Sequence, residues 1–204
     1  MAKQIEGVYE KVLECAKSEF LEKGFKDASL RIIAQNAQTS TGSIYTRFLD
    51  KGGLFNAIVL PVVDDLKKWF LEVQEDFEDL PKKRQEKEVF TYSKDKLEIF
   101  VDYIYDNFAI FKLLISCSDG TEYSKFIHDL VEIECDFTIK FIKNTENDAI
   151  LSKRLTLELM HMLNSSYFTG IFEIVLHDMN REIAHIYVKK LTKFFQAGWK
   201  DIFK

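Results

Sequence analysis

Short hydrogen-bonding side chains gather in one segment of the sequence, Ser40-Thr-Gly-Ser-Ile-Tyr-Thr-Arg-Phe48. Ile44 and Phe48 are four residues apart, which predicts that both lie on the buried face of a helix while the polar residues point elsewhere. Threonine and serine hydroxyls can reach base edges in the major groove of DNA, and tyrosine and arginine are long enough to contact phosphates. Gly42 has no side chain, so the helix backbone could approach a duplex closely. The segment indicates a helix that reads DNA.

Two serines stand where the helices that position this surface can begin. Ser29 precedes a helix predicted at about 30–37, and Ser40 precedes one at about 41–47, so each hydroxyl can accept a hydrogen bond from a free backbone N–H of the first turn. Ile32 stands where a capping box would have Glu or Gln, so that motif is incomplete at Ser29. Two short helices joined by a tight turn of about three residues predict a helix-turn-helix.

Longer helices are predicted on both sides of this pair. Apolar residues recur at intervals of three and four from Val8 to Phe20, and Gly24 follows where a helix commonly ends, with Phe25 able to pack back on it. Asp50 can cap a fourth helix that runs toward Phe77. Pro61 lies inside it and predicts a kink near residues 57–60.

Several features placed apart in the sequence carry a resemblance to a known family. Taken with Phe20, Gly24-Phe25, Ser29–Ala34 and Lys51-Gly-Gly-Leu-Phe55, the segment Ser40–Phe48 resembles the N-terminal domain of TetR-family transcription regulators over about the first 55 residues. The resemblance implies that Thr41, Gly42 and Ser43 lie deepest in the groove, with Tyr45 and Lys51 on phosphates. Together with the reasoning from residue types, it gives these candidate DNA-binding residues: Ser29, Arg31, Thr39, Ser40, Thr41, Gly42, Ser43, Tyr45, Thr46, Arg47 and Lys51.

Two positions depart from the family pattern. Gln38 stands where the turn usually has glycine, so we expect either a strained left-handed backbone or a slightly different turn. Gly52-Gly53 replaces acidic helix formers and is expected to weaken the start of the fourth helix by roughly 1 kcal/mol per glycine.

The composition limits the fold class. The chain has only two prolines and eight glycines, and these turn-forming residues are too few for the many turns of a β-fold. This favours an all-α chain of about nine helices. No stretch approaches the roughly 20 apolar residues of a membrane span, and three widely spaced cysteines fit neither a disulfide framework nor a metal motif. We therefore expect a cytoplasmic protein without a membrane partner. A net charge of −5 argues against a protein that coats nucleic acid all over, but it allows a local DNA-binding surface.

The rest of the chain predicts a helical regulatory and dimerisation domain at 51–204, behind a DNA-binding domain at 1–50. Polar residues at Pro81–Lys87 predict a solvated loop. Further apolar periodic stretches predict helices at about 89–106, 108–116, 121–143, 152–176 and 180–203.

Two E-x-x-H pairs raise an enzymatic alternative, because di-metal four-helix carboxylate proteins use this spacing. They are Glu158-Leu-Met-His161 and Glu182-Ile-Ala-His185. The second pair falls on the polar side of its helix, beside lysines that disfavour a metal. No nucleotide-binding or nucleophile motif occurs, so we predict no catalytic residues, metal or cofactor. A helical adaptor that binds only protein stays open as another alternative.

His161 also lies on a mostly apolar stripe, which could form one wall of a pocket for a small hydrophobic effector. The alternative interpretation is a core histidine within ordinary packing, with no role in ligand binding. The candidate pocket residues are Tyr103, Phe108, Phe111, Cys117, Tyr123, Phe126, Phe137, His161, Asn164 and Phe168.

The last two predicted helices have the small, aromatic and methionine residues of an interface. The candidate dimer residues are Leu155, Leu159, Met162, Ser166, Gly170, Tyr187, Leu191, Phe194 and Phe195. The resemblance implies a homodimer through a four-helix bundle of these helices. The sequence thus predicts a homodimeric, ligand-responsive repressor of a palindromic DNA operator.

Overall fold

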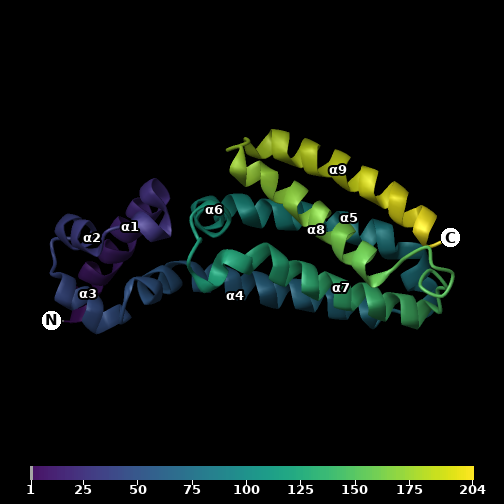
Figure 1. Ribbon diagram of the computed structural model, residues 1–204, viewed down its shortest axis with the longest axis horizontal. Helices are drawn as coiled ribbons and strands as arrows, with labels where there is room; N and C mark the ends of the chain where they lie inside the picture. Colours follow the sequence, from purple (N-terminus) through teal and green to yellow (C-terminus); the bar gives the residue numbers. More distant parts are fainter. Residues whose placement is uncertain (1) are drawn as a thin grey trace. The chain divides into compact units, whose positions relative to one another are not determined.

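A computed structural model describes residues 2–204, with side chains from Gly7 onward. In this range the chain forms nine α-helices and one short 3-10 helix (Figure 1), which are α1 (Ala2–Asp27), α2 (Leu30–Asn36), α3 (Thr41–Phe48), α4 (Lys51–Glu78), α5 (Lys82–Asp106), α6 (Phe108–Ser116), η1 (Glu122–Lys125), α7 (Phe126–Thr145), α8 (Leu157–Leu176) and α9 (Arg181–Ile202). No residue in it belongs to a strand, so the predicted all-α class is confirmed. Throughout the described part, each helix is too short or too polar to cross a lipid bilayer.

The chain packs as two compact units. Unit 1 contains residues up to Asp65 together with Asn107–Ser124, and unit 2 contains Leu66–Asp106 and Lys125–Lys204. The division by packing therefore falls inside α4, and it assigns α6 and all of η1 except Lys125 to unit 1. The functional boundary at residues 50 and 51 stays a prediction.

Aromatic residues from α1 and α4 form the core of unit 1. The Phe55 ring on α4 lies 5.2 Å from that of Phe20 on α1 and 5.5 Å from that of Phe25. The helical backbone of α1 is interrupted at Gly24, where φ is 74°, and this allows Phe25 to turn back onto the core as the sequence predicted. The backbone N–H of Phe25 then donates to the carbonyl of Cys117 at 2.9 Å, which fixes the end of α6 in this unit.

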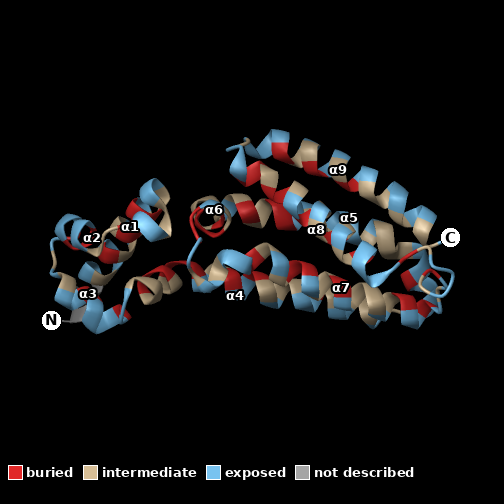
Figure 2. Cartoon of the chain, in the orientation of Figure 1, coloured by how far each residue is buried: buried red, intermediate tan, exposed pale blue. Residues whose placement is uncertain are grey.

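Unit 2 consists of α5, α7, α8, α9 and the second part of α4, which run as long neighbouring helices (Figure 1). Burial in it alternates along the helices at helical spacing (Figure 2), so each helix turns one face inward. Phe172 is fully buried, and its ring packs edge-on against Phe100 and Phe126 at 5.9 and 5.8 Å.

Two predicted boundaries in unit 2 were wrong. The polar segment after Pro81 is helical from Lys82, because proline suits the first turn of a helix and Arg84 pairs with Glu88 one turn later at 2.8 Å. The buried Gln85 adds hydrogen bonds to the carbonyls that end α4. Helix α8 begins at Leu157 and not at 152, because Thr156 caps it by accepting from the N–H of Leu159 at 3.2 Å.

Candidate nucleic-acid interface and ligand cavity

Serine caps fix the starts of α2 and α3, as the sequence predicted. The hydroxyl of Ser29 accepts from the backbone N–H of Ile32 at 3.4 Å, and that of Ser40 accepts from the N–H of Ser43 at 3.1 Å. Both serines have extended backbone dihedrals, which is the usual N-cap conformation. The two caps set where each helix begins and how the chain enters it.

The capping box that Ser29 lacks is completed from another helix. Glu19 on α1 is 9% exposed, and its carboxylate accepts from the backbone N–H of Ser29 at 3.0 Å. A glutamate three residues after the N-cap makes this same bond in an ordinary capping box. Glu19 was not among the residues predicted from the sequence, although its place among the apolar positions Val12, Ala16 and Phe20 indicates a buried, bonded carboxylate.

The turn between α2 and α3 contains the strain that the sequence predicted. Gln38 has φ 55°, in the left-handed region that favours glycine. Its neighbour Thr39 is half-buried and donates its backbone N–H to the carbonyl of Ala34 at 2.9 Å. The turn therefore keeps the backbone geometry of glycine with a glutamine side chain, which is exposed.

One face of α3 is buried and the other is open. Ile44 and Phe48 are 1% and 7% exposed, whereas Gly42, Ser43, Thr46 and Arg47 are exposed and Tyr45 is 52% exposed. A β-carbon placed on Gly42 would meet only the Ser40 hydroxyl, at 3.7 Å, so the fold itself does not require glycine here. The open side of Gly42 is the solvent-facing surface of α3.

Some predicted DNA-binding groups already have partners within unit 1. Lys51 donates from Nζ to the carbonyls of Lys26 and Ala28 at 2.8 and 3.1 Å, so it ties α4 to the end of α1. The guanidinium of Arg47 lies over the Tyr9 ring at 5.1 Å. These cations can still meet a phosphate from their exposed sides, but the structure shows that they also hold the unit together.

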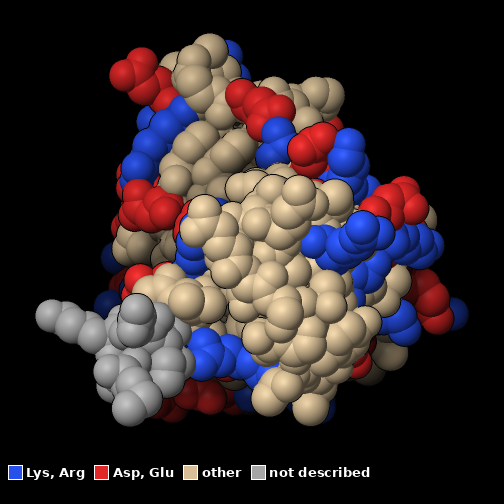
Figure 3. Space-filling model, turned by 90° about the vertical axis from the view of Figure 1, so that its left-hand side faces the viewer, with Lys and Arg blue, Asp and Glu red and all other residues tan. Residues whose placement is uncertain are grey.

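The remaining predicted residues keep short local bonds. The Ser40 and Ser43 hydroxyls lie 3.0 Å apart, and Thr46 donates to the Gly42 carbonyl at 2.9 Å. Arg31 is exposed and Thr41 is half-buried. Figure 3 looks toward the N-terminal end of the molecule, where uncharged side chains occupy the centre and Lys and Arg appear at the sides, with Asp and Glu among them.

The two glycines that open α4 have different roles. A β-carbon on Gly53 would lie 1.9 Å from the Phe48 carbonyl oxygen, whereas one on Gly52 would meet only a carboxylate oxygen of Asp50, at 3.2 Å. Asp50 caps the helix by accepting from the N–H of Gly53 at 2.7 Å. Gly53 is therefore needed because α4 starts against the end of α3, which the sequence did not reveal.

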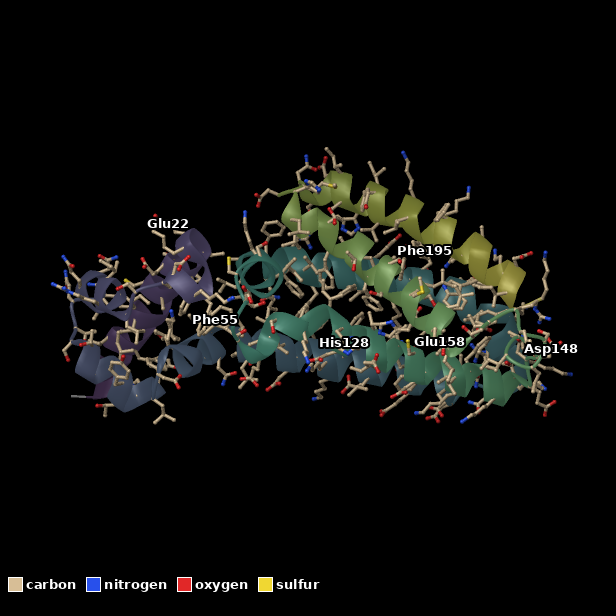
Figure 4. The ribbon with its side chains drawn as sticks, viewed as in Figure 1. Glu22, Phe55, His128, Asp148, Glu158 and Phe195 are labelled. Atoms are coloured by element: carbon tan, nitrogen blue, oxygen red, sulfur yellow. The ribbon has the colours of Figure 1, made fainter. Side chains whose placement is uncertain are left out.

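A cavity of about 190 Å³ lies within unit 2. Aromatic side chains form most of its wall, and Figure 4 labels one of them, Phe195, on α9. Its ring packs against that of Tyr167 at 5.1 Å. The walls come from α4, α5, α7, α8 and α9, and they include Trp69, Phe77, Phe100, Phe137, Phe141, Phe168 and Trp199.

Two paired polar groups interrupt this apolar wall. Glu134 accepts from Nε2 of Gln74 at 2.5 Å, and burial raises the pKa of its carboxyl to about 7 despite this bond. The Tyr167 hydroxyl lies 2.9 Å from that of Thr192, and burial raises the pKa of Tyr167 to about 12. Ser93, Lys96, Thr138, Asn164 and Gln196 also reach the lining. Polar groups placed within a mainly apolar wall are typical of a small-molecule site.

Three of the predicted pocket residues line this cavity, namely Phe137, Asn164 and Phe168. The other seven lie elsewhere. Phe108, Phe111, Cys117 and Tyr123 belong to unit 1, Phe126 packs on Phe172, and neither Tyr103 nor His161 lines the cavity. The aromatic residues of α4, α5 and α9 form the missing walls, because the helix bundle brings their inner faces together.

The two E-x-x-H pairs do not meet at one site. Glu158, labelled in Figure 4, is exposed in the first turn of α8, and hydrogen bonds from its own backbone N–H and from Thr156 lower the pKa of its carboxyl. His185 instead contacts Asp102 on α5 at 2.9 Å, and hydrogen bonds from Arg181 and His185 lower the pKa of Asp102. In a di-metal bundle the glutamate and histidine ligands of both pairs project inward from facing helices. The two E-x-x-H pairs of this chain are not arranged in this way.

The predicted dimer residues divide by exposure. Met162 and Phe194 are 63% and 74% exposed, and Leu159 is 38% exposed. Ser166 is also exposed, whereas Tyr187 is half-buried. Leu155 is buried, Phe195 lines the cavity, and Gly170 packs against Leu191 within the same chain. Three further exposed apolar side chains extend the set on α8 and α9: Leu176, Ile183 and Ile186.

Part of the chain is similar to known regulators in sequence. Residues 12–58 match the family model of bacterial regulatory proteins of the tetR family. Over 58 residues the chain is 41% identical to YvdT of Bacillus subtilis (strain 168), an uncharacterized HTH-type transcriptional regulator. That match covers 28% of this chain and 30% of the relative, so the chain aligns with less than a third of the relative's length.

Solved structures resemble the chain over most of its length. A Clostridium perfringens protein described as a fatty acid metabolism regulator has a TM-score of 0.56 at 20% identity, over 92% of this chain and 97% of that one. The TetR-family regulator CifR, as a cysteine mutant solved with 26-bp operator DNA, has a TM-score of 0.53 at 16% identity, over 89% and 94%. A TerR/AcrR-family regulator of Aquifex aeolicus VF5 has a TM-score of 0.51 at 19% identity, over 96% and 99%. These structures share the all-helical fold.

Proposed function

We propose that this chain is a member of the TetR family of bacterial regulatory proteins and a repressor that binds operator DNA as a homodimer. Helix α3 of each copy enters the major groove. Two such helices about 34–36 Å apart would read half-sites on one face of a duplex, so the operator is partly palindromic. A small hydrophobic effector in the unit 2 cavity releases the DNA.

The exposed face of α3 is the observation that carries the DNA-binding proposal. Its polar groups are short, they lie on a helix fixed by Ser40 at its start, and Gly42 leaves the backbone open to solvent. A helix of this kind can bring hydroxyl groups to base edges without steric exclusion. Neither folding nor packing within unit 1 accounts for an uncovered glycine in the first turn of α3.

Gly42→Ala separates DNA contact from folding. Alanine is a better helix former than glycine and meets no close neighbour here, so the free energy of unfolding should stay the same or rise by about 0.5–1 kcal/mol. Operator affinity should fall about tenfold or more, because the methyl group occupies space that the duplex needs. Binding is measured by fluorescence anisotropy on DNA from upstream of the gene.

Gly198→Ala is the matched control, because Gly198 lies on α9 in unit 2 and also has open space around it. It should leave DNA affinity unchanged. Equal DNA affinity of Gly42→Ala and the wild type would contradict the placement of α3 in the groove.

The exposed apolar residues of α8 and α9 support the homodimer. Leu159 and Met162 recur on α8, and Ile183, Ile186 and Phe194 recur on α9, at spacings that place each set along one side of its helix. Exposed apolar side chains that gather on one side of a helix are typical of an interface. Phe194→Glu should yield a folded monomer in sedimentation experiments, whereas the exposed, non-apolar control Lys189→Glu should stay dimeric.

The unit 2 cavity supports a small, mainly apolar effector with one or two polar groups. The dye 1-anilinonaphthalene-8-sulfonate provides a probe, because it fluoresces on binding apolar surface. Thr138→Phe places an aromatic ring in the cavity wall and should reduce dye binding while operator affinity is kept. Compounds that displace the dye are then tested for release of the operator from the wild type, and release that persists in Thr138→Phe would place the effector elsewhere.

A further inference from the structure

Three side chains able to bind a metal come together on α7 and α8. His128 and Glu132 lie one turn apart on α7, and His161 faces them from α8; Figure 4 labels His128. Nε2 of His161 lies 3.2 Å from Oε1 of Glu132, and Nδ1 of His128 lies 3.9 Å from the same oxygen. We propose that these three residues bind a divalent cation of the zinc class.

The spacing of the ligand atoms fits such an ion. One ligand atom from each of the three residues lies within 4.8 Å of the others. Zn²⁺ binds nitrogen and oxygen at about 2.0–2.2 Å, so two ligands of a tetrahedral site are about 3.3–3.5 Å apart. The two histidine–glutamate distances, 3.2 and 3.9 Å, lie on either side of this separation, and the two histidine ligand atoms lie within 4.8 Å of each other.

The ligand types of this cluster favour zinc over Mg²⁺ and Ca²⁺. Imidazole nitrogen suits zinc and its transition-metal neighbours, whereas Mg²⁺ and Ca²⁺ prefer sets made of oxygen. Three protein ligands leave a fourth position of the tetrahedron for water. Because the side chains of His128, Glu132 and His161 are 53%, 57% and 42% exposed, solvent can supply this water and the ion can enter directly.

Ordinary ion pairing explains the cluster less well. Within the described part of the chain, Glu132 forms ion pairs with the two histidines and with no lysine or arginine. The centroids of the two imidazole rings lie 5.6 Å apart, so both rings and the carboxylate converge on one place. One divalent cation would be shared by all three side chains.

The cluster is separate from the cavity and from the E-x-x-H pairs. None of its three residues lines the cavity. One turn further along the same two helices, Asn164 donates to the sulfur of Cys135 at 3.4 Å, so Cys135 already has a partner and is not a fourth ligand. His161 takes its carboxylate neighbour from α7 and not from Glu158 on its own helix. A bound ion would thus join α7 to α8 beside the Asn164 contact.

Zinc binding to the purified full-length chain tests this proposal. After chelator treatment and dialysis, calorimetry with ZnCl₂ should show about one ion per chain, and Co²⁺ should give the visible absorption of a tetrahedral site. Binding should weaken as the pH falls, because the histidines must lose their protons. MgCl₂ at the same concentration should give no heat of binding.

Variants decide which residues bind the ion. His161→Ala and His128→Ala should each weaken zinc binding about tenfold or more, and Glu132→Gln, which keeps the side-chain size, should do the same. His177→Ala is the matched control, because His177 pairs with Glu173 one turn away at 2.9 Å, and among the described residues no third ligand joins this pair. The proposal is wrong if the wild type binds no zinc, or if His177→Ala lowers the affinity as much as His161→Ala. Circular dichroism confirms that each variant is folded.

Discussion

The α3 surface and the unit 2 cavity use polar groups in opposite ways. On α3 the hydroxyl groups of Ser43 and Thr46 are exposed to water and bonded only to neighbours within one turn. In the cavity, Glu134 and Tyr167 are bonded to residues of other helices within an apolar wall. Water can be exchanged for DNA at little cost on the first surface, whereas an unpaired polar group in the second costs about 1–3 kcal/mol. Changes in the first region should therefore act on binding, and changes in the second on stability and pH dependence.

Gly53→Ala is expected to have the largest effect, and it tests whether the α3 region depends on packing as well as on its surface. Its methyl group would lie 1.9 Å from the Phe48 carbonyl oxygen, which is backbone and cannot move aside. We expect a loss of about 3 kcal/mol or more in the free energy of unfolding, measured by urea denaturation.

Gly52→Ala is the control for this variant. Its new methyl group meets only the flexible Asp50 carboxylate, at 3.2 Å, so the free energy of unfolding should change by less than about 1 kcal/mol. Equal losses for the two variants would mean that helix propensity, and not the contact with α3, determines the need for glycine.

Glu134 should make stability depend on pH in the cavity region. Its carboxyl has a pKa of about 7 when folded and about 4.5 when unfolded, so the folded state holds a proton that the unfolded state loses between these values. Stability should fall as the pH rises from about 4.5 to 7 and change little above that range. A shift of this size corresponds to about 3 kcal/mol of stability.

Comparison with Glu134→Gln isolates this effect from other titrating groups. The amide cannot ionise, so the variant's advantage over the wild type should grow between pH 5 and pH 8 in urea denaturation. Glu88→Gln is the control, because Glu88 pairs on the surface with Arg84 and its carboxyl pKa is lowered. An advantage that does not vary with pH would mean that Glu134 stays ionised in the folded protein.

Glu19→Ala tests the link between α1 and the start of α2. It leaves the backbone N–H of Ser29 without its acceptor and should cost about 1.5 kcal/mol in the free energy of unfolding. Glu22→Ala is the control, since Glu22 is exposed on the same helix and pairs only with Lys23. If Glu19→Ala left the free energy of unfolding unchanged, water would replace the carboxylate as the acceptor for the Ser29 N–H.

The helix-turn-helix could be predicted from the sequence because its determinants are local. Ser29, Ser40 and the strained Gln38 act on backbone within three residues of themselves, so their types and spacing reveal the caps and the turn. The two missed features, Glu19 and Gly53, are those that depend on contact with another helix. Even there, a carboxylate on an apolar stripe was a visible signal.

The cavity could not be placed in the same way, because it is made by residues far apart in sequence. Gln74 and Glu134 are 60 positions apart, and nothing in either helix reveals that they face each other. Helical spacing does show which side of α8 is buried, and for this reason Asn164 and Phe168 were found. The same limit applies to His161, whose carboxylate partner is on α7 and not in the E-x-x-H pair of its own helix.

Tyr167→Phe is expected to have the smallest effect and tests how far the paired polar groups stabilise the cavity. The change removes only the hydroxyl that bonds to Thr192 at 2.9 Å. Thr192 keeps its own bond to the Val188 carbonyl at 2.8 Å, so no buried donor is left without a partner. The loss should therefore be about 1 kcal/mol or less in the free energy of unfolding.

Thr192→Val is the companion variant, because it removes the partner and leaves the Tyr167 hydroxyl unpaired in an apolar wall. It should cost more than Tyr167→Phe, and the double variant should cost less than the sum of the two single ones. Strictly additive losses would show that the two hydroxyls do not stabilise each other, and operator affinity should be unchanged in all three proteins because α3 is untouched.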